Sequence, residues 1–94
     1  MQPREIKVGQ LVYSRAGRDR GRPFLVWQIA DSRRVFVVDG IIRRTAKPKA
    51  KNIIHIQAVN RIDLTIAERL KQGEIITDAE VRKTIARLIG TQGA

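Results

Sequence analysis

The chain has 94 residues, 19 of them Lys or Arg and 9 Asp or Glu, so its formal net charge is +10. The length allows one domain with a modest core. No apolar run approaches the ~20 residues of a membrane span, and none follows the N-terminus as in a secretory signal. The absence of cysteine excludes disulfides and thiolate metal sites and fits an intracellular protein. A charge so far from zero indicates a polyanionic partner, nucleic acid first.

The first part of the chain carries the pattern of a β-hairpin. Residues 11–14 and 24–29 are apolar runs with strand character, and the second run is rich in β-branched and aromatic residues. The connection between them contains Gly17 and Gly21. A Gly-containing connection between two such runs is typical of a hairpin, so we expect two paired strands here.

Three further strands are expected in the next segment. Residues 35–38 form a continuous apolar run, which indicates a well-buried strand. Asp39-Gly40 then predicts a two-residue type I′ turn into a fourth strand at residues 41–42. After a Lys- and Pro-containing loop at residues 45–52, residues 53–56 are predicted as the fifth strand. Five short strands so closely spaced predict a mainly β fold, a small closed or half-closed barrel.

The last third of the chain changes to helical spacing. Residues 63–72 predict a short helix that begins after Asp63 and ends before Gly73. Thr77 and Glu80 match a capping box, and a stripe at helical spacing follows at Val81, Ile85, Leu88 and Ile89. We therefore expect residues 1–60 to form the barrel and residues 61–94 a helical extension packed on the same domain.

Basic residues gather in two segments of the predicted barrel. Residues 1–60 contain 13 basic and 4 acidic side chains, whereas residues 61–94 contain 6 and 5. Arginine suits bidentate contact with phosphate, although cation runs also serve in nuclear targeting or simply keep a surface solvated. The candidate phosphate-binding residues are Arg15, Arg18, Arg20 and Arg22 in the first segment and Arg43, Arg44, Lys47, Lys49 and Lys51 in the second.

The other polar and aromatic residues give little indication of chemistry. The sequence does not decide whether Arg33, Arg34 and His55 contact the partner. Trp27 shares a strand face with apolar neighbours, so core packing is expected before base stacking. His55 has no partner at metal-ligand spacing, and no nucleophile–base set, P-loop or dinucleotide fingerprint occurs. We therefore expect no catalytic residue, no metal and no cofactor.

Residues 8–29 resemble a KOW motif, which consists of a strand, a loop rich in glycine and basic residues, and a second strand. The resemblance extends over residues 6–89, which are similar to the archaeal and eukaryotic large-subunit ribosomal protein family numbered fourteen. The segments that carry it are residues 29–31, 35–38, 43–44, 52–56, 72–73 and 77–83. The chain departs from this family in one place, because only residues 39–42 precede the basic pair Arg43-Arg44, where the family has a longer connection.

The resemblance implies a five-stranded SH3-like (KOW) barrel with one or two C-terminal α-helices, which binds ribosomal RNA. It matches the first four arginines to the KOW loop and the other five cations to the basic stretch before the last strand. We expect a non-enzymatic, cytoplasmic RNA-binding protein, ribosomal or ribosome-associated. Its partners would be ribosomal RNA and ribosomal proteins, with no membrane contact, and the free protein would be a monomer. The rival hypothesis is a KOW protein-interaction module of the transcription-elongation factor type.

Overall fold

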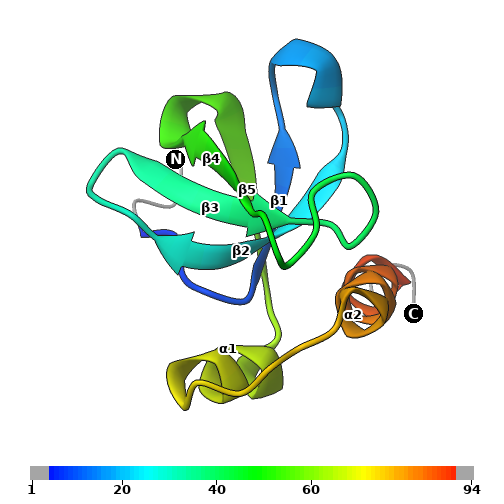
Figure 1. Ribbon diagram of the computed structural model, residues 1–94. Helices are drawn as coiled ribbons and strands as arrows, with labels where there is room; N and C mark the ends of the chain where they lie inside the picture. Colours follow the sequence, from blue (N-terminus) through cyan, green and yellow to red (C-terminus); the bar gives the residue numbers. More distant parts are fainter. Residues whose placement is uncertain (1–4, 91–94) are drawn as a thin grey trace.

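The computed structural model describes residues 5–90, which form a mainly β fold with two C-terminal helices. The strands are β1 (Gln10–Ser14), β2 (Pro23–Ile29), β3 (Arg34–Val38), β4 (Lys49–Asn52) and β5 (Ile56–Ile62). They make one antiparallel sheet in the order β4-β3-β2-β1-β5, which curves into a small barrel-like fold (Figure 1). The fold class expected from the sequence is confirmed.

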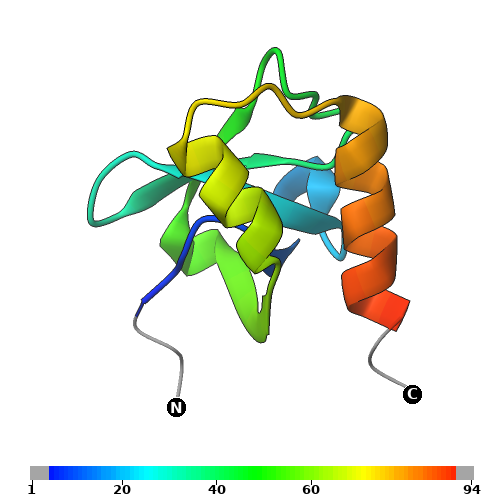
Figure 2. The same cartoon turned by 90° about the horizontal axis from the view of Figure 1, so that it is seen from below.

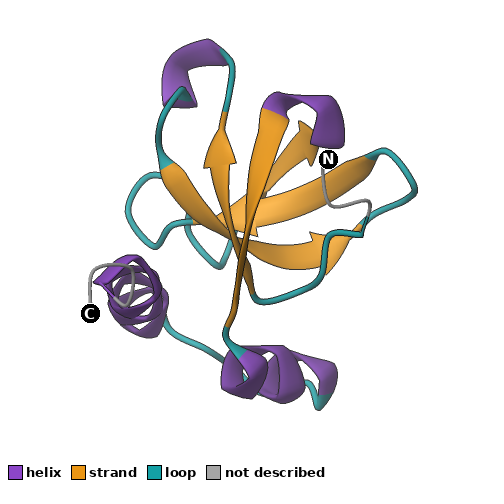
Figure 3. Ribbon diagram, turned by 180° about the vertical axis from the view of Figure 1, so that it is seen from behind, coloured by secondary structure: helices purple, strands orange, loops and turns teal. Residues whose placement is uncertain are grey.

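Short 3-10 helices interrupt two connections of the sheet, and two α-helices follow it. The 3-10 helices are η1 (Gly17–Asp19), between β1 and β2, and η2 (Ile53–His55), between β4 and β5. The α-helices are α1 (Leu64–Lys71) and α2 (Asp78–Gly90). Seen from behind, both α-helices lie at one end of the sheet and both 3-10 helices at the other (Figure 3). Within residues 5–90, neither α-helix has the length and apolar character that crossing a membrane requires.

The central strands are apolar on both faces because both faces of the sheet are covered. Side chains alternate along a strand, so neighbours such as Leu11 and Val12 enter different apolar clusters. The cluster inside the curved sheet contains Val12, Phe24, Val26, Val35, Val37 and Ile56. The cluster between sheet and helices contains Leu11, Leu25, Val38, Ile66, Ile76, Val81, Ile85 and Leu88, with Tyr13 and Trp27 half-buried against it. The core placement expected for Trp27 is confirmed.

Helix α1 begins at the predicted cap. The Asp63 carboxylate accepts a hydrogen bond from the Ile66 amide at 2.8 Å and forms an ion pair with Arg87 of α2. Burial by itself raises the pKa of Asp63, but the Ile66 amide and Arg87 outweigh it, so the net pKa lies below its ordinary value. The cap of α1 therefore also anchors α2, and α1 lies across the sheet beside it (Figure 2).

Helix α2 starts with the predicted capping box. The Thr77 hydroxyl accepts from the Glu80 amide at 3.2 Å, and the Glu80 carboxylate accepts from the Thr77 amide at 3.0 Å. Arg69 Nη1 of α1 donates a hydrogen bond to the same carboxylate at 2.6 Å. This contact and the Thr77 amide together lower the pKa of Glu80 to about 2. The predicted stripe is also confirmed, since Val81, Ile85 and Leu88 are buried.

The segment after β3 differs from the sequence prediction. Residues 41–42 form no strand, because the Asp39 carboxylate accepts their amides, which a sheet partner would otherwise have used. A type I′ turn needs positive φ at both central residues, and no residue other than glycine has positive φ within residues 5–90. The fourth strand is instead β4, inside the predicted basic loop, where Val35 and Val37 of β3 pair with Lys51 and Lys49.

The fifth strand begins later than expected. Residues 53–55 form η2, whose first turn is capped by the Asn52 side chain, which accepts from the Ile54 amide at 3.0 Å. Strand β5 starts at Ile56 and runs to Ile62, beyond residue 60, where the sequence placed the end of the barrel.

Candidate nucleic-acid interface

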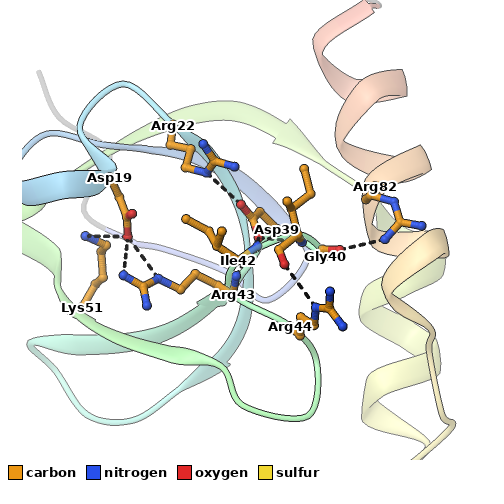
Figure 4. Close-up of polar contacts among 10 residues, drawn as sticks. Asp19, Arg22, Asp39, Gly40, Ile42, Arg43, Arg44, Lys51 and Arg82 are labelled. Carbon is orange, nitrogen blue, oxygen red and sulfur yellow. Dashed lines mark hydrogen bonds and ion pairs between the residues drawn. The ribbon is translucent and has the colours of Figure 1, made fainter.

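The two basic segments come together at one side of the sheet. The β1–β2 loop spans residues 15–22, and the β3–β4 loop spans residues 39–48. In an antiparallel sheet, the connection into β2 and the connection out of β3 lie at the same end of these two strands. We call these two loops together with β4 the two-loop surface; Figure 4 shows the polar contacts that join them.

Asp19 holds the β1–β2 loop against the second basic segment. Helix η1 places this carboxylate inside the protein, where Arg43 donates to Oδ2 from Nε at 3.2 Å and from Nη2 at 3.0 Å. Lys51 Nζ lies 3.9 Å from the same oxygen and donates to Ser14 Oγ at 3.1 Å. One buried acid therefore joins cations from the β3–β4 loop and from β4 (Figure 4).

Asp39 shapes the β3–β4 loop. Its Oδ1 accepts the amides of Ile41 (2.9 Å), Ile42 (3.1 Å) and Arg43 (2.9 Å), and Arg22 Nε donates to Oδ2 at 2.9 Å. Burial alone raises the pKa of this carboxyl, but the Ile41 and Arg43 amides and Arg22 outweigh burial and lower the pKa overall. Asp39 is therefore charged at neutral pH and fixes the first part of the β3–β4 loop, up to Arg43.

Helix α2 holds the same loop from the other side. Asp78 accepts from the Thr45 amide at 2.8 Å, and Arg82 Nη1 donates to the Gly40 carbonyl at 2.7 Å. Gly40 has φ +77°, and a Cβ at this position would lie 2.5 Å from the Asp78 carbonyl oxygen. Only glycine fits both this backbone conformation and this close approach, so the loop and the helix fit together as one unit.

The nine predicted phosphate-binding residues divide into two groups. Arg22, Arg43 and Lys51 form ion pairs with the buried acids, and Arg44 Nε donates to the Ile41 carbonyl at 3.1 Å. The others have exposed side chains with no hydrogen bond or ion pair to any residue in the range 5–90: Arg15, Arg18, Arg20, Lys47 and Lys49. The paired guanidinium groups still reach solvent, since the Arg22 and Arg43 side chains are 37% and 31% exposed.

The residues left undecided by the sequence lie elsewhere or at the margin. Arg33 lies in the turn between β2 and β3, and Arg34 is the first residue of β3, at the opposite ends of these strands from the two-loop surface. Arg34 forms an exposed ion pair with Asp31 at 3.3 Å. His55 is exposed and lines a shallow hollow together with Gly17 and Lys51, so it borders the two-loop surface.

Sequence reasoning missed the residues that organise this surface. Asp19 is the only acid in the first basic segment, and Asp39 was assigned to a turn, so neither was connected with the cations. The available signal was a lone carboxylate amid four arginines, because a buried acid must find cationic or amide partners. Nothing in the local sequence indicates that Asp78 and Arg82 reach the loop.

Comparison with models of known protein families gives no match, and comparison with curated protein sequences finds no significant relative. Within residues 5–90, no group of three or more His, Cys, Asp or Glu side chains is arranged to hold a metal ion.

Proposed function

We propose that the protein is a non-enzymatic RNA-binding protein of the cytoplasm, ribosomal or ribosome-associated, which grips ribosomal RNA through the two-loop surface. The observation that carries this proposal is the set of five exposed, unpaired cations beside four that are anchored to the protein. Phosphate contacts supply most of the affinity in such complexes, and they need cations that are accessible and collected on one surface.

The anchored cations contribute differently from the free ones. Arg22 and Arg43 already have fixed positions, so a phosphate that binds their remaining N–H groups orders little additional structure. Arg15, Arg18 and Arg20 extend into solvent and can follow the irregular backbone of a folded RNA. The two groups together suit recognition by shape and charge more than by base sequence.

The choice of ribosomal RNA rests on the resemblance of residues 8–29 to a KOW motif and of residues 6–89 to the ribosomal family. In-cell crosslinking followed by sequencing of the bound RNA tests this part. We expect reads concentrated at a few positions of ribosomal RNA. Reads spread over messenger RNAs, with no enrichment of ribosomal RNA, would overturn the ribosomal assignment while leaving RNA binding intact.

RNA binding itself is tested by its salt dependence. We expect the affinity for a fluorescein-labelled single-stranded RNA, measured by anisotropy from 50 to 300 mM KCl, to fall with a log–log slope of about −4. This slope corresponds to about six neutralised phosphates at about −0.7 each. A slope near zero would remove the electrostatic account and with it the proposed function.

One observation favours the rival, a module that binds a protein. Ile41 and Ile42 near the start of the β3–β4 loop are 52% and 53% exposed, and contiguous exposed apolar side chains mark protein contacts. An apolar contact of this kind would keep its affinity at high salt, so the same titration separates the two functions.

A further inference from the structure

An apolar groove lies between helix α2 and the β3–β4 loop, at the edge of the two-loop surface. Pro23 and Ile41 line it on the side of the barrel, and Ala86 and Ile89 line it on the helix. The cations Arg22 and Arg82 lie along the same groove. Phosphate groups gain nothing from aliphatic walls, so the cations of the two-loop surface do not by themselves account for this site.

The polar groups of the groove are only partly used within the protein. The charge of Asp39 is compensated within the protein, because Oδ2 forms an ion pair with Arg22 and Oδ1 accepts backbone amides. Arg22 uses Nε for Asp39, and Arg82 uses Nη1 for the Gly40 carbonyl (Figure 4). Each guanidinium retains further N–H groups and a planar face, because arginine carries five donors in a fixed plane.

We propose that one unpaired base of the bound RNA inserts into this groove, with its neighbouring phosphates on Arg22 and Arg82. This inference rests on the proposed RNA-binding function and adds a base-binding site to it. A base presents flat apolar faces to aliphatic walls and guanidinium planes, and it carries a phosphate on either side. It is the part of an RNA that matches a groove with apolar walls and two cations.

The size of the groove favours a base over a protein segment. Eight of the described residues line it, whereas each partner in a stable protein interface contributes about 20–30 residues. The groove also continues directly into the two-loop surface, since Arg22 belongs to both. A strand held on the β1–β2 loop therefore passes the mouth of the groove, and insertion needs one base to turn out of the stack.

The test compares two probes with the same number of phosphates: a fluorescein-labelled 12-nucleotide oligouridine RNA and a 12-unit abasic strand with the same backbone charge. Ala86 is exposed on α2, so Ala86→Met fills the groove with neutral bulk while keeping a good helix former. Ala79→Met is the matched control, because Ala79 is exposed on the same helix and outside the groove. The two variants should have the same midpoint temperature of thermal unfolding, so that a difference in binding does not reflect a difference in stability.

We expect Ala86→Met to weaken binding of the oligouridine about tenfold, within the range of one lost base contact. Binding of the abasic strand should not change, and Ala79→Met should bind both probes like the wild type. Equal affinity of the wild type for both probes, or no effect of Ala86→Met on either, would overturn the inference. The groove would then fit the rival hypothesis, in which this part of the surface contacts a protein. Failure of the RNA-binding function is a different result, in which the wild type binds neither probe in a salt-dependent way.

Discussion

The two-loop surface and the helical region use the same pairing of arginine with carboxylate in different ways. In the helical region, Arg69 forms ion pairs with Glu80 and Glu74 near the surface, and buried Asp63 pairs with a single cation, Arg87. In the two-loop surface, the acids are buried while the cations reach outward, and Asp19 alone lies against two of them. The comparison shows that net charge per segment locates cations, but the positions of the acids decide which of those cations are paired and which remain available to a partner.

The first prediction concerns the acid that shapes the β3–β4 loop, where a large loss of stability is expected. Asp39→Ala should lower the free energy of unfolding by about 3 kcal/mol, because three amides and Arg22 lose their acceptor at a site where the carboxylate is buried. Urea unfolding followed by circular dichroism measures this. Asp31→Ala, which removes an exposed ion pair and two exposed amide hydrogen bonds, is the control and should cost far less. Equal losses would mean that burial of the acid does not distinguish the two sites.

A second prediction tests whether the helices stabilise the sheet. Ile85 is 7% exposed and packs in the cluster that joins α2 to β1, β2 and β3. Ile85→Ala should destabilise the protein by about 2–4 kcal/mol, the usual range for a buried isoleucine truncated to alanine, and unfolding should remain a single transition. An unchanged midpoint in urea would show that the helical region contributes nothing to the stability of the barrel.

A third prediction sharpens the comparison at the level of binding. Arg18→Ala with Arg20→Ala should weaken RNA binding and reduce the salt slope by about 1.4, since two contacts of about 0.7 each are lost. The stability should hardly change, because both side chains are exposed and unpaired within residues 5–90. The matched pair Lys71→Ala with Lys83→Ala, on α1 and α2, should leave the slope unchanged. Equal losses from the two pairs would contradict the assignment of the surface.

The smallest expected effect is a pH dependence in the helical region. Glu80 has a folded-state pKa of about 2 against an ordinary value of 4.5, so its ionised form stabilises the fold. This contribution is complete above pH 4.5 and is lost as the pH falls through about 2. The midpoint temperature of thermal unfolding of Glu80→Gln should therefore lie below that of the wild type at pH 6. The difference between the two midpoints should narrow toward pH 2. A gap of constant size would exclude the carboxylate as its source.

The predictable parts of the fold are those whose sequence patterns lie within the element itself. Strands β1 to β3 are apolar runs, and the starts of both helices are marked by side chains that cap the next turn, Asp63 and Thr77. Strand β4 was missed because it is a polar edge strand, which the backbone of β3 specifies rather than its own side chains. Residues 41–42 look like a strand, but the carboxylate of Asp39 captures their amides first.

The candidate site was predictable in composition but not in arrangement. The cations could be read from the sequence because arginine and lysine runs are local features. Their division into anchored and free groups depends on Asp19 meeting Arg43, 24 residues away, and on Asp39 meeting Arg22, 17 residues away. Such contacts follow from the register of the sheet, and a short stretch of sequence does not predict that register.

The contact between α2 and the β3–β4 loop also sets the order in which the protein can assemble. Thr45 and Asp78 are 33 residues apart and Gly40 and Arg82 are 42 apart, whereas the β1–β2 hairpin needs only neighbouring segments. Contacts of long sequence separation form late in folding, because the entropy of closing the chain is lost before they stabilise it. A folding intermediate with the hairpin formed and α2 undocked would already carry all its cations. Its β3–β4 loop would keep the hydrogen bonds to Asp39 but would lack the support of Asp78 and Arg82.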